Sequence, residues 1–302
     1  MFETLKVFLR NRKALTGLII VLVYVAVAVF GPLLLNVDPM DRVGRPHQPP
    51  SPDELLGTTR MGRDVFAQVI YGTRTSLAVG FFAGTIIVLI GTFLGIAAGY
   101  FGGWFDEVIT FFTNVVLVIP QLPLLLVIAA FMGQTSPLVI AIIIGLTSWA
   151  WGARVTRSQT LTLRNREYIL ASELTGERPA RMIFVELLPN LLSIIGFNFI
   201  GSVTYTIITQ ATLEFLGLGN PMSVSWGTML YHAQNTSAIT IGAWWEVLVP
   251  AVAVAGIGVG LSLLNFGVDE ISNPRLRTLG TVAAAVRAQQ KLDRQRLAET
   301  RA

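Results

Sequence analysis

The amino-acid sequence predicts an all-α integral membrane protein with six transmembrane helices, and its composition is the first reason. Hydrophobic residues make up 53% of the 302 residues, and charged residues only 13%. A soluble globular chain carries about 25% charged residues. The second reason is that the sequence contains six apolar runs, and no Lys or Arg lies inside any of them. The third is the distribution of basic residues between the runs, which fits a single membrane topology.

The first run, residues 14–35, reaches the length of about 20 residues that a membrane-spanning helix needs. It is too long for the apolar core of a signal peptide, and no Ala-x-Ala cleavage site follows it. We therefore interpret it as a transmembrane helix with a cytoplasmic N-terminus. The remaining predicted spans are residues 77–99, 108–131, 138–151, 191–212 and 244–266.

Three of these runs carry features that shape a helix. In the second run, the glycines from Gly80 to Gly99 lie close to one helical face, so another helix can approach its backbone closely. In the third run, Pro120 and Pro123 predict a bend within a helix. The fourth run is short, so its helix should continue beyond the last apolar residue, with Arg154 extending to the membrane surface.

Basic residues assign the two sides of the membrane. Four Lys or Arg residues precede the first run, six lie in residues 152–189 and seven follow the last run, whereas five lie in residues 38–76. Because basic residues are enriched in cytoplasmic loops, we predict that both termini and residues 152–189 are cytoplasmic. The chain then divides into residues 1–76 (a helix and an extracytoplasmic loop), residues 77–277 (a core of five helices) and residues 278–302 (a cytoplasmic tail).

Residues 152–189 form a charged segment that hydrocarbon would exclude, since it contains six arginines. It is rich in Ala, Leu, Glu and Arg, which favour helix. Gly176 predicts the end of a first short helix, and Pro189 the start of the next one. The segment reads Glu-Tyr-Ile-Leu-Ala-Ser-Glu-Leu-Thr-Gly over 167–176 and Leu-Leu-Pro-Asn over 187–190. It resembles the cytoplasmic coupling loop of the membrane subunits of type I ABC importers.

This resemblance implies that a coupling helix at residues 167–177 docks in a cleft of an ATPase subunit. Leu170 stands where these proteins usually carry glutamate. We therefore expect Leu170 to pack in an apolar part of the cleft while Glu173 makes the charged contact. The residues that the resemblance assigns to ATPase coupling are Glu167, Tyr168, Leu170, Ala171, Ser172, Glu173 and Gly176.

Further segments resemble the dipeptide/oligopeptide branch of these permeases. Residues 56–64 read Leu-Gly-Thr-Thr-Arg-Met-Gly-Arg-Asp, and residues 71–77 read Tyr-Gly-Thr-Arg-Thr-Ser-Leu. Residues 213–219 read Leu-Glu-Phe-Leu-Gly-Leu-Gly, and residues 226–230 read Trp-Gly-Thr-Met-Leu. Three positions depart from the residues usual in the branch: Thr59, Gln210 and Glu214.

The resemblance covers residues 1–277 and implies the type I ABC importer permease fold, with six helices and a cytoplasmic coupling helix. It further implies a homologous second permease, two ABC ATPase subunits and an extracytoplasmic solute-binding protein at a bacterial or archaeal cytoplasmic membrane. ATP and magnesium are expected in the ATPase subunits, because no lysine follows a glycine here, as a phosphate-binding loop requires.

No catalytic, cofactor or metal site is expected in this chain, which has no cysteine and only two histidines. The sequence pI near 9.7 reflects basic residues that set the topology beside membrane lipid, and we predict no nucleic-acid partner.

Polar side chains in two predicted spans suggest a translocation path. In the fifth span they recur at intervals of three and four residues and so share one helical face. They face either a water-filled path or hydrogen-bond partners on other helices, because lipid would leave them unsatisfied. No charge lies deep in a predicted span, which favours a neutral or zwitterionic solute. The candidates are Asn198, Ser202, Tyr205, Thr209 and Thr212 in the fifth span, with Thr110, Asn114 and Gln121 in the third.

Two other classes of protein are the alternatives. A self-sufficient secondary transporter often has repeated halves and ionisable residues at an ion site within the membrane, and an intramembrane enzyme needs a catalytic constellation. None of these features is found in the sequence. The branch points to a peptide, an oligosaccharide or a related small solute such as a nickel complex, and the sequence does not decide among them.

Overall fold

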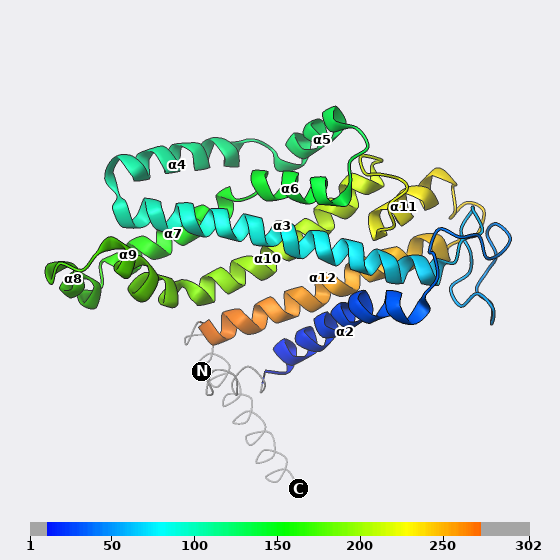
Figure 1. Ribbon diagram of the computed structural model, residues 1–302, viewed down its shortest axis with the longest axis horizontal. Coiled ribbons are helices and arrows are strands. Elements are labelled where there is room, and N and C mark those ends of the chain that lie inside the picture. The colour runs from blue at the N-terminus through cyan, green and yellow to red at the C-terminus, as the bar shows by residue number, and fades with distance from the viewer. Residues whose placement is uncertain (1–10, 273–302) are drawn as a thin grey trace, which may run out of the picture.

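The computed structural model describes residues 11–272, which form a bundle of helices (Figure 1). The predicted tail at residues 278–302 and the start of the N-terminal segment lie outside the described residues. Within them, the only β pairing consists of three isolated bridges. The elements are α2 (Arg12–Leu35), α3 (Val65–Phe101), α4 (Gly103–Val118), α5 (Gln121–Met132), α6 (Pro137–Thr147), α7 (Ala150–Arg164), α8 (Glu167–Leu174), α9 (Pro179–Arg181), the π-helical η1 (Met182–Leu187), α10 (Leu188–Phe215), α11 (Trp226–Asn235) and α12 (Trp245–Ser272).

The predicted all-α membrane fold is confirmed, with two of its spans sharply bent. Four continuous helical segments are long and apolar enough to cross a membrane: Arg12–Leu35, Val65–Phe101, Pro179–Phe215 and Trp245–Val268. Two helix pairs, α4 with α5 and α6 with α7, pass the same test together, which gives six spans when each pair counts as one.

Helix α3 is the centre of the bundle, and its glycine row explains why. In Figure 1 it runs along the middle of the molecule, between α10 on one side and α4–α6 on the other. A Cβ atom at Gly84 would lie 2.8 Å from the side chain of Val203 on α10, and one at Gly95 would lie 2.6 Å from the carbonyl oxygen of Ala153 on α7. The predicted close approach at the glycines is confirmed, with Gly80 and Gly84 facing α10 and Gly91, Gly95 and Gly99 facing α7.

The helix that contains the second predicted span starts earlier than residue 77, because α3 begins at Val65; the predicted boundary of the external segment at residue 76 stays a prediction. The Asp64 carboxylate caps the helix by accepting from the backbone N–H groups of Phe66 (2.8 Å) and Ala67 (3.2 Å). The first three turns contain polar residues that lower the hydropathy of the segment. Packing against other parts of the chain buries several of them: Gln68, Thr73 and Ser76.

The third predicted span is a broken helix rather than one bent helix. Helix α4 ends at Val118, Ile119 and Pro120 are extended, and α5 starts at Gln121 after a turn of 82°. Proline lacks the N–H group that a continuous helix would need at this position. Because of this break, α4 and α5 pack against different neighbouring helices.

The fourth span continues beyond its apolar run, as predicted, because α7 extends to Arg164 after a bend of 41° from α6. The expectation for Arg154 is corrected in one respect. Its guanidinium Nη2 donates to the side-chain oxygen of Asn114 at 2.7 Å, so the side chain is tied to α4.

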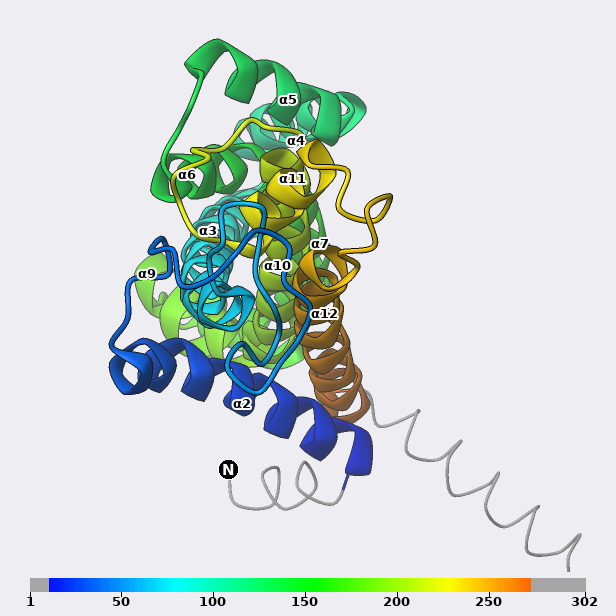
Figure 2. The same ribbon diagram turned by 90° about the vertical axis from the view of Figure 1, so that its right-hand side faces the viewer.

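The loop of residues 36–64 closes the end of the bundle that lies opposite α8 (Figure 2). The indole Nε1 of Trp245, at the start of α12, donates to the carbonyl oxygen of Thr58 (3.1 Å). His47 Nδ1 contacts a carboxylate oxygen of Glu246 at 2.6 Å. Gln68 on α3 donates to the carbonyl oxygen of Pro39 (3.2 Å). The loop is therefore attached to both α3 and α12.

Candidate translocation cavity and coupling helix

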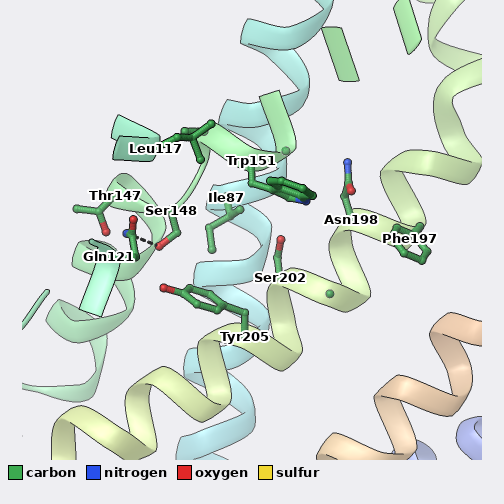
Figure 3. A pocket seen from close by; sticks show the side chains of 13 residues that line it. Ile87, Leu117, Gln121, Thr147, Ser148, Trp151, Phe197, Asn198, Ser202 and Tyr205 are labelled. Carbon is green, nitrogen blue, oxygen red and sulfur yellow. Dashed lines mark hydrogen bonds between the residues drawn. The ribbon is translucent and has the colours of Figure 1, made fainter. Parts of the chain in front are cut away.

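A cavity of about 410 Å³ lies beside α10 where both bent spans break. Figure 3 shows its lining, with Ile87 from α3 at the back. Gln121 is the first residue of α5, and Ser148 is the C-cap of α6. The side-chain amide of Gln121 donates to Ser148 Oγ at 3.0 Å, so a hydrogen bond joins the two breaks directly at the wall of the cavity.

The lining of this cavity combines neutral polar groups with aromatic surface. Asn198 and Ser202 supply an amide and a hydroxyl group, and Trp151 and Tyr205 supply aromatic rings. None of the residues that line the cavity is charged. A Cβ atom added at Gly201 would meet nothing within 4 Å, so this glycine leaves room for the cavity rather than for a neighbouring helix of the chain.

The structure brings together only part of the predicted polar set. Asn198, Ser202 and Tyr205 from α10 and Gln121 from α5 line the same cavity. Sequence reasoning missed three further residues of the lining, around the α6–α7 break, whose side chains carry hydrogen-bonding groups. The short fourth apolar run, residues 138–151, was a usable signal, because the break between α6 and α7 lies within its last residues. The missed residues are Thr147, Ser148 and Trp151.

The other predicted path residues lie elsewhere. Thr209 is buried (6% exposed). Thr212 donates to the carbonyl oxygen of Ile208 in its own helix, and it borders a separate groove between α10 and α12. Asn114 lines another pocket, and Thr110 donates to Asp106 (3.1 Å) in the same helix. The predicted stripe is thus divided among different surroundings.

Polar contacts bind α4 to α7. Arg157 forms an ion pair with Asp106, in which both carboxylate oxygens accept from the guanidinium. The hydrogen bond from Arg154 to Asn114 lies two turns further along α4. Because the chain passes from α7 into α8 within three residues, a movement of α8 that displaces α7 must also act on α4.

Two buried carboxylates lie at the end of the bundle opposite α8. Glu214, in the last turn of α10, is 1% exposed and accepts from Gln210 (3.0 Å) and from the hydroxyl of Ser225. Glu246, in the first turn of α12, is paired with His47. Gln210 and Glu214 therefore contact one another, although the sequence presented them as two separate departures from the usual residues.

The predicted coupling helix is α8, which ends where the glycine predicted. Gly176 has a φ of +76°, in the left-handed region that favours glycine. Its N–H donates to the carbonyl oxygen of Glu173 (3.0 Å), and the N–H of Glu177 donates to that of Ser172 (3.3 Å). These bonds close the helix in the manner typical of a glycine C-cap.

One side of α8 is anchored in the bundle. Ile169 is fully buried in an apolar cluster with Ile96 and Tyr100 of α3 and Met182 and Leu187 of η1. This anchor fixes the orientation of α8 and decides which of its side chains face outward.

The outward side of α8 is largely apolar. Leu170 is 45% exposed and Leu174 is 89% exposed, and their spacing of four residues places them on one face. Tyr168, Ala171 and Glu167 are also exposed. Sequence reasoning missed Leu174, although its distance of four residues from Leu170 was a usable signal.

Two predicted coupling residues form contacts within the chain. Ser172 Oγ donates to the carbonyl oxygen of Tyr168 at 3.0 Å. A carboxylate oxygen of Glu173 lies 3.7 Å from Arg164 Nε at the end of α7. The charge of Glu173 is thus already compensated within the chain, and its contact with an ATPase subunit stays a prediction.

Comparison with known protein families shows in which kind of protein this arrangement occurs. Residues 91–278 match the family described as binding-protein-dependent transport system inner membrane component. Residues 2–50 match the N-terminal transmembrane domain of oligopeptide transport permease C. The chain belongs to the family of binding-protein-dependent transport system inner membrane components. It is a permease subunit of an ABC importer.

Similar permeases cover nearly the whole chain. The dipeptide transport system permease of Alkalihalophilus pseudofirmus is 33% identical over 283 residues, which cover 91% of this chain and 90% of that protein. The oligopeptide transport system permease of Bacillus subtilis is 31% identical over 89% of this chain and 88% of that protein. The glutathione transport system permease of Pectobacterium atrosepticum is 32% identical over 90% of each chain.

Membership of this family corrects one alternative and supports the predicted branch. The alternative of a self-sufficient secondary transporter is wrong for this permease. The family name states dependence on a binding protein, which implies a solute-binding protein and ATPase subunits as partners. Among the residues that the structure describes, no group of three or more His, Cys, Asp or Glu side chains is placed to hold a metal ion.

Proposed function

We propose that this permease forms half of the translocation path for a peptide or a related small solute, such as an oligosaccharide. The observation that carries the proposal is the uncharged polar and aromatic cavity at the two helix breaks. The amide and hydroxyl groups of Asn198, Ser202 and Gln121 match the hydrogen-bonding capacity of peptide groups. Relatives that are named for dipeptide, oligopeptide and glutathione transport favour a peptide.

The proposed assembly contains a homologous second permease, two ABC ATPase subunits and an extracytoplasmic solute-binding protein in a bacterial or archaeal cytoplasmic membrane. ATP and magnesium bind to the ATPase subunits. Helix α8 and both termini face the cytoplasm, while loop 36–64 faces outward. The basic residues that flank the spans support this orientation.

Movement passes from the ATPase subunits to the cavity through α8. When ATP closes the ATPase dimer, α8 moves with the cleft that holds it. Ile169 and the contact of Glu173 with Arg164 tie α8 to the bundle. The contacts of Arg157 and Arg154 with α4 carry the displacement to the other bent span. The two helix breaks then move relative to α10, which changes access to the cavity.

Ser202→Leu should strongly reduce solute uptake while the four-subunit complex still assembles. The larger side chain would fill space in the cavity without replacing a packed core residue. We expect uptake of labelled dipeptide into proteoliposomes to fall about tenfold or more, as a misplaced or blocked substrate position can do.

The matched control is Thr209→Val, which is nearly isosteric at a buried position outside this lining. It should retain uptake within about twofold of wild type because its side chain lies outside the cavity, although exchanging a buried hydroxyl for a methyl group changes the stability. Normal uptake by Ser202→Leu would contradict the proposed path. Loss of ATPase subunits on purification would instead show that Ser202 serves helix packing.

Single cysteines test the proposed orientation, because the natural chain has none. Ser51→Cys in the outer loop should react with an impermeant thiol reagent in intact spheroplasts, and Thr175→Cys at the end of α8 should react only in inside-out vesicles. Both positions are exposed. Labelling of Thr175→Cys in spheroplasts would reverse the orientation.

A further inference from the structure

A second pocket, of about 300 Å³, opens at the end of the permease opposite α8. The loop segment 59–63, the end of α11 and the start of α12 form its walls. In Figure 2, which faces this end of the molecule, the loop lies across the bundle near α12. The pocket is separate from the translocation cavity, since the two have no lining residue in common.

Two arginines of this pocket lack an acidic partner. Arg60 is exposed, and Arg63 is partly buried. Across residues 11–272, neither guanidinium takes part in an ion pair or a side-chain hydrogen bond. Arg63 also lies directly across an antiparallel bridge from Arg42. Like charges at such positions repel one another, so the fold concentrates uncompensated positive charge here.

The acidic member of the lining is already engaged. Glu246 contacts His47 Nδ1 at 2.6 Å, and the backbone of Arg60 also forms a hydrogen bond with it. Its carboxylate is thus directed to the loop that it holds in place.

The walls of the pocket are held by contacts that do not involve the two guanidinium groups. His232 Nε2 lies 3.0 Å from the carbonyl oxygen of Pro221. Asn235 donates to the carbonyl oxygen of Tyr231 (3.0 Å). Gln68 donates to the carbonyl oxygen of Pro39. A pocket with fixed walls and free cationic ends needs little reorganisation to bind a partner, which favours affinity.

We propose that Arg60 and Arg63 form a receptor site for an acidic side chain of the solute-binding protein. The arrangement fits a carboxylate, because guanidinium groups bind planar carboxylates through paired hydrogen bonds. The volume accommodates an Asp or Glu side chain. This inference rests on the proposed function, which places the pocket on the side from which a solute-binding protein approaches.

The two arginines should affect different steps of docking. Exposed rim charges mainly change the association rate and its salt dependence, whereas more buried charge pairs mainly change the dissociation rate. Arg60→Gln should therefore slow association about tenfold at low salt, and Arg63→Gln should speed dissociation about tenfold.

The test uses the complete importer in lipid nanodiscs and a solute-binding protein that stimulates ATP hydrolysis by the wild-type complex. Association and dissociation rates are measured by biolayer interferometry for wild type, Arg60→Gln, Arg63→Gln and the matched control Arg45→Gln. Arg45 lies in the same loop and is exposed, but it does not line the pocket. The control should bind within about twofold of wild type.

Arg63→Lys is included in case Arg63→Gln fails to fold. Lysine retains the positive charge but cannot form the paired hydrogen bonds of a guanidinium group with a carboxylate. This variant should give a dissociation rate between those of wild type and Arg63→Gln. Rates within twofold of wild type in both glutamine variants would overturn the assignment. Absence of any stimulating binding protein for wild type would contradict the proposed function instead.

Discussion

Gly95→Leu should prevent α7 from packing on α3 and abolish recovery of the assembled importer. A Cβ atom at position 95 would lie 2.6 Å from the carbonyl oxygen of Ala153 and 3.0 Å from the backbone nitrogen of Arg157. These backbone atoms cannot rotate away as the end of a flexible side chain can, so a helix must move. Overpacking of a core typically costs about 1–3 kcal/mol, and leucine adds three carbons beyond the Cβ atom.

The smaller change Gly95→Ala should fold with reduced stability, which fluorescence-detected size-exclusion chromatography after heating would measure. The matched control is Gly196→Ala on α10, where a Cβ atom meets nothing within 4 Å. Alanine there gains helix propensity of about 1 kcal/mol over glycine, so its melting temperature should equal or exceed that of wild type. If Gly95→Leu assembled and melted as wild type does, close packing at the glycine row would not hold the bundle together.

Replacing Leu170 and Leu174 together by serine should detach the ATPase subunits. These leucines form the apolar outward side of α8, with 45% and 89% of their surfaces exposed in this chain. Full burial of one leucine contributes about 1.5–3 kcal/mol. Loss of about 3 kcal/mol for the pair corresponds to roughly 100-fold weaker association. Solute-stimulated ATP hydrolysis should fall as well. Its dependence on the concentration of ATPase subunits should show the same weakening of association.

A matched control for the serine variant is Glu177→Gln. It removes the exposed ion pair with Arg181 just beyond α8, a type of contact worth about 0–1 kcal/mol. It should co-purify with ATPase subunits as wild type does. If the double serine variant also retained them and was stimulated normally by solute, then α8 would not be the docking element. Thermal melting of the permease should be unchanged in both variants, because neither leucine belongs to the apolar clusters of the bundle.

The pair Gln210 and Glu214 illustrates how tertiary structure joins separate sequence observations. Each residue departs from the family pattern, and their spacing of four residues is compatible with a contact along a helix. Only the structure shows that α10 continues to Phe215 and that Ser225 donates to the carboxylate from the start of α11. The carboxylate thereby holds together two segments that the sequence treats as a span and a loop.

Sequence by itself determined the features that depend on local chemistry. Apolar runs require a membrane environment, so the class of fold and its six spans could be predicted. The glycine row predicted a close helix contact, and Gly176 predicted the end of α8, because only a residue without Cβ tolerates these positions easily. Basic residues supplied an orientation that the proposed labelling experiment tests.

Tertiary structure alone decided what each face of a helix meets. The polar residues of α10 share one helical face, yet Ser202 borders the cavity, Thr209 is buried and Thr212 borders another groove. Periodicity fixes directions around one axis, but it contains no information on where other helices cross or break along that axis. For the same reason, the polar first turns of α3 resembled a loop: their hydropathy is local, whereas the burial of Gln68 and Ser76 depends on segments distant in the chain.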